Sequence, residues 1–416
     1  MRKLLKSPVQ IITVDSKGKN YKRGKDAANI LPLNEHSIII EDKIIKDIIP
    51  NSSVKKYTFD QTINCEGYIV LPGLIECHTH TAFAGSRSNE FLMRLNGATY
   101  EQIAESGGGI ISTVKAVRQS SFEELIKIIK PRIDFFISQG VTTLEIKSGY
   151  GLSYYDEIKL LQVINYFKKT LPIEIIPTFL GAHTYPPEYK NDHKKYLKII
   201  SDELLPFIIQ NGLAEYIDAF CESSAFSANE VDQIFTRAVK LGYKIRLHTE
   251  QFNNIDGLDV ALKHNALSVD HLEVIKESDI QKLNDSQTVA VLLPGVSFFL
   301  DYQFAPAREL IDNNAIVALS TDYNPGSSNI SNLHLIMSLA VLKMKMTAEE
   351  VISGVTINAA KALDISKRTG SIEINKQADF SLFKAKDYSE IVYNIGQNLN
   401  EITIKNGEII YKRNPE

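Results

Sequence analysis

The sequence has little cysteine, no long apolar run and almost no net charge. Its three cysteines, Cys65, Cys77 and Cys221, are too few and too scattered for a disulfide framework or a cysteine metal knuckle. No stretch approaches the roughly 20 apolar residues of a membrane span, and the first residues lack the apolar core of a secretion signal. We therefore expect a cytoplasmic chain with no membrane partner.

A charge surplus and one metal motif are also missing. The 46 Lys and Arg residues against 50 Asp and Glu residues give a net charge of −4, which offers no general attraction for nucleic-acid phosphates. The Pro-Cys-x-x-Cys motif of one class of zinc deaminases is absent. We therefore expect no nucleic-acid partner and exclude that deaminase class.

Both ends of the chain have a pattern of short strands. Residues 10–65 contain β-rich runs separated by turn residues, and residues 370–412 repeat this pattern, with a hairpin turn at Asn406-Gly407. We expect residues 1–65 and 368–416 to combine into one small β-sandwich domain. The middle of the chain would then be an insertion between its two halves.

The middle of the chain, residues 66–367, alternates strand-like apolar runs with helical stretches. Eight candidate strands can be counted, at residues 73–80, 141–149, 173–183, 216–222, 243–250, 266–273, 288–295 and 315–322. Eight parallel strands with crossover helices in about 300 residues predict a (β/α)8 TIM barrel. A doubly wound sheet is the alternative, but the Gly-x-Gly-x-x-Gly fingerprint after the first strand is missing.

The stretch VLPGLIECHTH, residues 70–80, carries the clearest chemical signal. Its apolar run predicts a buried strand, and Pro72-Gly73 predicts the bend by which the chain enters the barrel from another layer. Because strand side chains alternate, His78 and His80 point the same way and can bind one metal ion. A pair of structural histidines at a strand end is the alternative for so short a motif.

Chemically reactive side chains end most of the other candidate strands, and a barrel would gather them at one mouth. They include Lys147, Tyr150, His183, Glu222, His248, His271 and Asp322. The two histidines of the first strand, together with His248 and Asp322, would supply nitrogen and oxygen ligands and leave a position for water, as catalytic zinc requires. Asp322 would exchange a proton with that water, while His271 and His183 would polarise a carbonyl or hold the substrate.

Longer motifs surround these strand ends. The segment HTHTAFAGSRSNEFLMRLNGATYEQIAESGGGIISTV is followed in order by LEIKSGYGL, TFLGAH, LHTEQF, DHLE and LSTDYNPGSS. Together they resemble the metal-dependent amidohydrolase superfamily and, within it, the imidazolonepropionase family of histidine degradation. The resemblance spans nearly the whole chain.

The resemblance implies a role for each site residue. His78, His80, His248 and Asp322 correspond to metal ligands, Arg87, Tyr150, His183, Gln251, Asn324, Gly326 and Ser327 to substrate contacts, and Asp322, His271 and His183 to catalytic groups. The guanidinium of Arg87, beside Tyr150, would bind the propionate of the substrate. Gln251 would offer a donor and an acceptor to the imidazolone ring.

The implied reaction is hydrolysis of 4-imidazolone-5-propanoate to N-formimidoyl-L-glutamate by a homodimer. One Zn²⁺ or Fe³⁺ per subunit is expected, because imidazole and carboxylate ligands suit both ions. Two-metal relatives use a bridging group on the fourth strand. This chain has Glu222 there, so the presence of a second ion stays an open alternative. The roles of Glu250 and Lys147 are also open, although Lys147 can simply pair with Glu145. Another cyclic amidohydrolase, a purine or pyrimidine deaminase, and a non-catalytic barrel scaffold are the alternatives.

Overall fold

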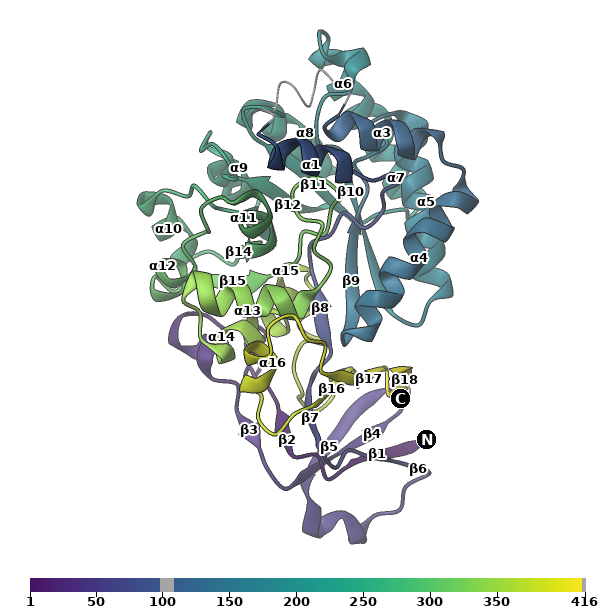
Figure 1. Ribbon diagram of the computed structural model, residues 1–416, viewed down its shortest axis with the longest axis vertical. Coiled ribbons are helices and arrows are strands. Elements are labelled where there is room, and N and C mark those ends of the chain that lie inside the picture. The colour runs from purple at the N-terminus through teal and green to yellow at the C-terminus, as the bar shows by residue number, and fades with distance from the viewer. Residues whose placement is uncertain (98–107, 414–416) are drawn as a thin grey trace.

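A computed structural model describes residues 1–97 and 108–413 of the chain. Eight parallel strands form one sheet in sequence order, each paired with the next. They are β8 (Leu74–Glu76), β9 (Val141–Lys147), β10 (Glu174–Ala182), β11 (Tyr216–Cys221), β12 (Lys244–Thr249), β13 (Ser268–His271), β14 (Val289–Leu292) and β15 (Ile316–Leu319). Thr79 and Tyr323, just beyond the first and last strands, pair across the seam. The predicted (β/α)8 barrel is confirmed (Figure 1).

Helices connect the strands and cover the outside of the barrel (Figure 1). Those between the first barrel strand and the last part of the chain are α1 (Ser88–Leu95), α3 (Ile110–Gln119), α4 (Phe122–Ser138), α5 (Tyr154–Thr170), α6 (His193–Lys198), α7 (Leu205–Gln210), α8 (Ala228–Lys240), α9 (Gly257–Lys263), α10 (Glu277–Asn284), α11 (Pro294–Leu300), α12 (Ala307–Asp312), α13 (Leu333–Met344), α14 (Ala348–Gly354), α15 (Ile357–Ala362) and α16 (Ser389–Tyr393). Short 3-10 segments are η1 (Gly24–Ala28), η2 (Asn51–Lys56) and η3 (Pro187–Tyr189), and η4 (Ile199–Leu204) is a π-helix.

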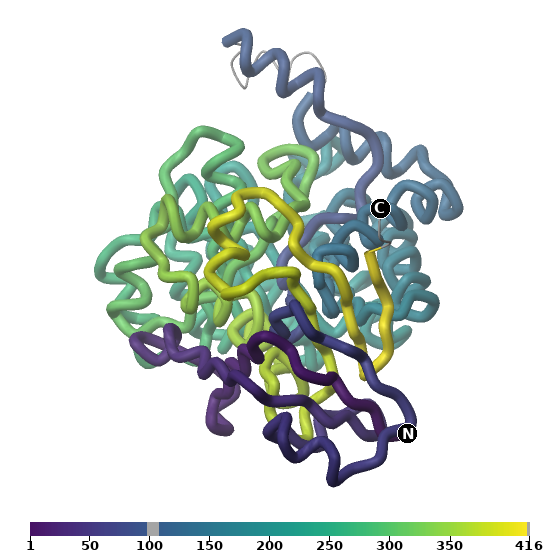
Figure 2. The backbone as a smooth tube through the Cα atoms, turned by 60° about the horizontal axis from the view of Figure 1, so that its bottom comes forward, coloured from purple at the N-terminus to yellow at the C-terminus, as the bar shows by residue number. Residues whose placement is uncertain are grey.

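The sequence of α4 explains why such a segment is helical. Ser121 and Glu124 form a capping box at its start, and Leu125, Ile129 and Ile133 recur at a four-residue spacing that buries one face. By contrast, α1 projects from the barrel and has no buried residue (Figure 2). Among the residues described, no helix is long and apolar enough to cross a membrane.

Strands from the two chain ends form two further sheets, drawn in purple and yellow below the barrel in Figure 1. Their orders are β18-β17-β16-β7-β2-β3 and β5-β4-β1-β6. The strands are β1 (Arg2–Lys6), β2 (Gln10–Ile12), β3 (Pro32–Leu33), β4 (His36–Glu41), β5 (Ile44–Pro50), β6 (Gln61–Asn64), β7 (Tyr68–Pro72), β16 (Phe380–Lys384), β17 (Asn400–Lys405) and β18 (Glu408–Lys412). Ile11 and Phe380 of the first sheet share an apolar core with Ile38 of the second, so the sheets pack face to face as the predicted sandwich.

Gly73 is the turning point between the sandwich and the barrel. β7 ends at Pro72, and a β-carbon on Gly73 would lie 2.2 Å from Oγ1 of Thr142, so only glycine fits against β9 here. The expected bend is present, but residues 66–72, which we assigned to the barrel domain, lie in β7 or lead into it. We therefore propose Gly73 as the start of that domain; its end at residue 367 stays a prediction, and residues 98–107 and 414–416 of the assigned ranges lie outside the described residues.

The strand before the two histidines is shorter than predicted. β8 ends at Glu76 rather than at His80. Beyond it, the backbone N–H of His80 donates to the carbonyl oxygen of Tyr323 at 3.0 Å, and Oγ1 of Thr79 donates to the carbonyl oxygen of Glu145 at 2.7 Å. These bonds to both neighbouring strands replace the regular ladder and hold the histidine segment in place.

Glu174 joins the barrel to the sandwich. Its carboxylate, at the start of β10, accepts hydrogen bonds from Arg368 at 2.9 Å and from Lys405 of β17 at 3.0 Å. Burial by itself raises the pKa of Glu174, but the hydrogen bond from Arg368 and the charge of Lys405 lower it to about 2. The folded chain therefore stabilises the charged form.

We expect Glu174→Gln to lower the free energy of unfolding at pH 7 by about 2 kcal/mol, because two cations lose their shared carboxylate. The pKa of Glu174 lies below its ordinary value of 4.5. Its contribution is therefore complete above pH 4.5 and is lost as the pH falls toward 2. Calorimetry should give a smaller difference in Tm between wild type and variant at pH 3 than at pH 7, and an equal difference would contradict the role of the charge.

Candidate active site

The carboxyl ends of the barrel strands surround a cavity of about 680 Å³. All of the predicted site residues except His78 line it, namely His80, Arg87, Tyr150, His183, His248, Gln251, His271, Asp322, Asn324, Gly326 and Ser327. His78 lies beneath the floor of the cavity and is fully buried. The barrel therefore brings together side chains that are spread over most of the sequence.

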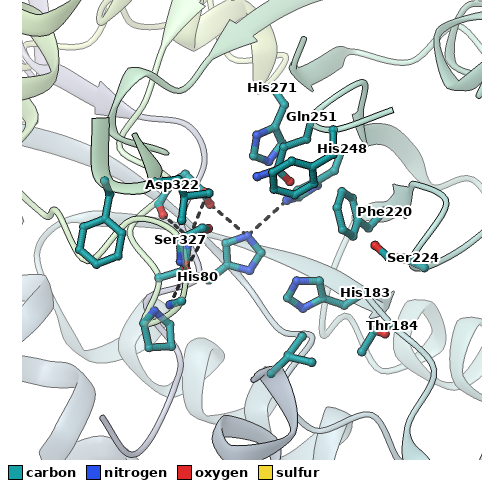
Figure 3. Close-up of a pocket in the computed structure, with 18 of the residues that line it drawn as sticks. His80, His183, Thr184, Phe220, Ser224, His248, Gln251, His271, Asp322 and Ser327 are labelled. Atoms are coloured by element: carbon teal, nitrogen blue, oxygen red, sulfur yellow. Dashed lines mark hydrogen bonds and ion pairs between the residues drawn. The ribbon is translucent and has the colours of Figure 1, made fainter. Parts of the chain in front are cut away.

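Three imidazole nitrogens and one carboxylate oxygen meet at the floor of the cavity. Oδ1 of Asp322 lies 3.3 Å from Nε2 of His78 and 3.2 Å from Nε2 of His80. Nε2 of His80 in turn lies 3.2 Å from Nε2 of His248. Figure 3 shows Asp322 and His248 on either side of His80, with His271 and His183 nearby.

Buried carboxylates hold the other ring nitrogen of two of these histidines. Nδ1 of His78 lies 2.6 Å from Oδ2 of Asp270, and Nδ1 of His248 lies 3.0 Å from Oδ1 of Asp218. Because an ionised carboxylate only accepts hydrogen bonds, Nδ1 carries the proton in each ring. In the neutral form of each ring, Nε2 then presents a lone pair toward Asp322 and His80.

The ligand atoms of His78, His80 and Asp322 can hold a metal ion, since all three lie within 4.8 Å of one another. Within residues 1–97 and 108–413, neither Nε2 of His78 nor Oδ1 of Asp322 makes a hydrogen bond, although both atoms are buried, which is uncommon for polar atoms. Ligands bound tetrahedrally at about 2.0–2.1 Å from zinc lie roughly 3.3 Å apart. The separations of Asp322 from His78 and His80, and of His80 from His248, agree with that value, so the cluster can hold an ion that activates water.

Asp322 and His271 take left-handed backbone conformations, with φ of 48° and 90°. Side chains with a β-carbon rarely adopt them, and they cluster at functional sites. Asn324 stabilises the turn after Asp322: its Nδ2 donates to Oδ2 of Asp322 at 3.0 Å, and its Oδ1 accepts from the backbone N–H groups of Gly326 and Ser327 at 2.8 Å. The amide of Asn324 is thus occupied within the chain and orients Asp322.

The wall of the cavity holds two neutral donors or acceptors. Burial and the nearby His80 lower the pKa of His183 to about 3, and its Nδ1 donates to the carbonyl oxygen of Gly149 at 2.9 Å. Nε2 of His183 is therefore a hydrogen-bond acceptor. Burial, helped by the charge of Asp322, raises the pKa of Tyr150, so the phenol keeps its proton and can donate.

His271, at the end of β13, has the opposite character. Burial by itself lowers the pKa of its ring, but the carboxylate of Glu273, 3.4 Å from Nδ1, raises the pKa above its ordinary value. With Nδ1 directed at the carboxylate of Glu273, the protonated form of His271 would have an N–H at Nε2 that can donate a hydrogen bond into the cavity.

Arg87 and Gly326 fit against each other on the wall. Nε of Arg87 lies 2.7 Å from Oε2 of Glu90, and Arg87 lines the cavity. A β-carbon on Gly326 would lie 2.1 Å from Nη1 of Arg87, so any side chain there would displace the guanidinium. The pair therefore places a guanidinium at the cavity wall, and such a group can bind a carboxylate.

Glu222 fixes the loop that carries Gln251. Its Oε2 accepts the backbone N–H groups of Phe252 at 2.9 Å and Asn253 at 3.1 Å. Neither Glu222 nor Glu250 is among the residues that line the cavity, and burial raises the pKa of Glu250 to about 7. Glu222 is therefore engaged with the backbone, and the structure places Glu250 behind the site.

Known proteins match this chain over nearly its full length. An imidazolonepropionase from Flavobacterium johnsoniae is 39% identical over 408 residues, which cover 98% of this chain and 99% of that protein. An imidazolonepropionase from Christiangramia forsetii is 41% identical over 388 residues, covering 93% and 94%. The chain belongs to the imidazolonepropionase family.

A broader family and several solved structures agree with this membership. The model of the Amidohydrolase family matches residues 201–410. A guanine deaminase from E. coli (TM-score 0.73, 14% identity, all of both chains covered) and a zinc-bound adenosine deaminase from Xanthomonas campestris (TM-score 0.73, 15% identity, 98% and 92% covered) share the fold. The match to the Amidohydrolase family and the histidine–aspartate cluster together indicate a bound metal ion.

The strand-end pattern and the imidazolonepropionase family resemblance missed three charged residues that support the cluster. They are Asp218 in β11, Arg246 in β12 and Asp270 in β13, each fully buried within an apolar strand. A parallel barrel strand is buried on both faces, so a charged residue inside it must have a buried partner. A charged residue within an apolar strand was therefore the sequence signal for these contacts. The expected pairing of Lys147 with Glu145 is present, at 2.9 Å.

We expect the imidazole ring of His183 to stay neutral throughout the pH range around neutrality. Its pKa of about 3 lies below the ordinary value of 6.5, so protonation is opposed until the pH approaches 3. In protein labelled with ¹³C-histidine, the His183 signal, assigned from His183→Asn, should keep its neutral shift from pH 8 to pH 5. A titration midpoint near pH 6.5 would contradict the buried environment of the ring. His334, a second buried histidine with a pKa of about 4, is the control.

Proposed function

We propose that this chain hydrolyses 4-imidazolone-5-propanoate to N-formimidoyl-L-glutamate, a ring-opening step of histidine degradation. The observation that carries the proposal is the placement of a histidine–aspartate cluster and the guanidinium of Arg87 around one cavity. The cluster suits hydrolysis of a cyclic amide, and the guanidinium suits a substrate carboxylate. The relatives named imidazolonepropionase support the same substrate.

We propose that one Zn²⁺ or Fe³⁺ per subunit is bound by four residues, namely His78, His80, His248 and Asp322. Imidazole and carboxylate ligands suit either ion. When bound, the ion supplies Lewis-acid chemistry, which makes a water molecule more acidic and a carbonyl more electrophilic. The carboxylate of Glu222 already accepts two backbone N–H groups, which favours a single ion.

Arg87 is the group that holds the substrate. Its Nη groups bind the propionate, while Glu90 fixes Nε and Gly326 leaves room for the guanidinium. Tyr150, whose phenol keeps its proton, donates a further hydrogen bond to the same carboxylate. The reacting ring is thereby placed over the cluster at the floor of the cavity.

His183 and His271 bind different edges of the ring. Nε2 of His183 accepts a hydrogen bond from the N–H of the imidazolone, because the N–H at Nδ1 already donates to the carbonyl oxygen of Gly149. His271 donates to the ring carbonyl oxygen, where negative charge develops during attack. His271 is therefore the group that polarises the carbonyl, and Gln251 presents its amide to the remaining edge of the ring.

Asp322 moves the proton. It accepts a proton from the attacking water as the new C–O bond forms at the ring carbonyl carbon. It then returns that proton to the ring nitrogen as the C–N bond breaks, so one water is consumed and a carboxylate is formed. Asn324 holds Oδ2 of Asp322 throughout and acts by orientation, while Ser327 and Gly326 complete the wall beside Arg87.

Two finer expectations from the sequence belong to the same proposal. The active protein is a homodimer, as the family resemblance implies, and it works in the cytoplasm with a small-molecule substrate as its partner. Size-exclusion chromatography with light scattering gives the assembly directly.

Purified protein should hydrolyse 4-imidazolone-5-propanoate, followed by the loss of its ultraviolet absorbance, faster than guanine, hydantoin or dihydroorotate. Asp322→Asn should lower kcat by about 10²–10⁴-fold, because an amide cannot accept the proton. Faster turnover of another compound in this panel would assign a different substrate. Near-normal turnover by the variant would remove Asp322 from proton transfer.

Gly326→Ala should raise KM for the imidazolone by about tenfold, a loss of roughly 1.4 kcal/mol of carboxylate binding. The reason is steric, since the new β-carbon would occupy the position of Nη1 of Arg87. Gly354→Ala is the matched control, because its β-carbon would meet Leu319 only at 3.4 Å, outside the cavity. Equal kinetic constants for both variants would contradict the placement of Arg87.

A further inference from the structure

Two cations are completely buried inside the barrel, below the ligand histidines. Lys147 ends β9 and Arg246 lies in β12, and neither side chain is exposed. A buried cation is unfavourable unless anions compensate it. Two of the carboxylates that do so here, Asp218 and Asp270, also contact the rings of His248 and His78.

Lys147 reaches His248 through Asp218. Nζ of Lys147 lies 2.9 Å from Oδ2 of Asp218, and the other carboxylate oxygen, Oδ1, lies 3.0 Å from Nδ1 of His248. Oδ1 also accepts the backbone N–H of His248 at 3.2 Å. With one oxygen held by the ammonium group, the carboxylate cannot turn away from the ring.

Arg246 reaches His78 in the same way. Its Nη2 lies 2.9 Å from Oδ2 of Asp270, the oxygen that is 2.6 Å from Nδ1 of His78. Its Nη1 donates to the carbonyl oxygen of Cys77 at 2.7 Å, and its Nε donates to Oγ of Ser268 at 3.0 Å. One guanidinium thus fixes both the backbone before His78 and the carboxylate behind its ring.

Glu145 links the two arrangements. Its Oε1 lies 2.9 Å from Nζ of Lys147 and 3.7 Å from Nη1 of Arg246. Its Oε2 accepts the backbone N–H of Thr79, the residue between the two ligand histidines, at 3.0 Å. The cations, the carboxylates and the histidine segment therefore form one connected and fully buried network.

We propose that Lys147 and Arg246 are positioning residues that set the metal affinity of the site. They act through Asp218 and Asp270, which keep the Nε2 lone pairs of His248 and His78 aimed at a common point. The inference rests on the ligand set of the proposed function. It predicts that removing a buried positive charge weakens the binding of a cation, whereas charge repulsion alone predicts stronger binding.

The test measures Zn²⁺ affinity of the metal-free full-length protein by competition with a chromophoric chelator. Lys147→Met and Arg246→Met should each weaken Zn²⁺ binding by about 10–100-fold. If Lys147→Met does not fold, Lys147→Gln, which keeps a hydrogen-bond donor, takes its place. Lys405→Met is the matched control, because Lys405 is also buried between two carboxylates, Glu174 at 3.0 Å and Asp379 at 2.9 Å, but at the junction with the sandwich.

A double variant separates positioning from general structural support. If Lys147 acts through Asp218, then Lys147→Met should change the Zn²⁺ affinity of Asp218→Asn protein by less than about threefold. The same comparison holds for Arg246 and Asp270. The inference would be overturned if the Lys147→Met and Arg246→Met proteins bind Zn²⁺ as tightly as wild type, or more tightly. It would also be overturned if the losses of Zn²⁺ affinity add up in the double variants. Wild-type protein that binds no Zn²⁺ would instead refute the ligand set of the proposed function, and this inference with it.

Discussion

The meeting of Asp322 with His78 and His80 across the seam of the barrel is the contact on which the site depends. The histidines follow the first strand and the aspartate follows the last, so they are neighbours only when the eight strands have paired in order. The pairing of Thr79 with Tyr323 lies at the same seam. The barrel must therefore close before Asp322 can meet the two histidines.

Around this contact, charged side chains lie in the barrel interior, where apolar side chains are usual. Three carboxylates and two cations lie together inside the barrel, and each is fully buried, namely Glu145, Asp218, Asp270, Lys147 and Arg246. Such a network is unfavourable unless every member is paired. Its members hold ring nitrogens and backbone groups of the histidine segment, so rigidity at the metal site is what the buried charge provides.

Much of this could be predicted from the sequence because the relevant pattern is local. The spacing of His78 and His80 and the polar residue at each strand end follow from strand geometry, and they predicted the barrel and its mouth. Contacts across the barrel could not be predicted in this way. The partners of Asp218 and Asp270 depend on strand register, and the need for glycine at position 326 depends on where Arg87 folds back.

Gly73 also has a consequence for the order in which the chain is made. It joins β8, which leads to His78 and His80, to β7, which in the six-stranded sheet pairs with β2 near the start of the chain and with β16 near its other end. A chain that leaves the ribosome from its N-terminus produces β7 hundreds of residues before β16. β7 can thus pair with β2 early, but its other edge is covered by β16 only when synthesis is almost complete.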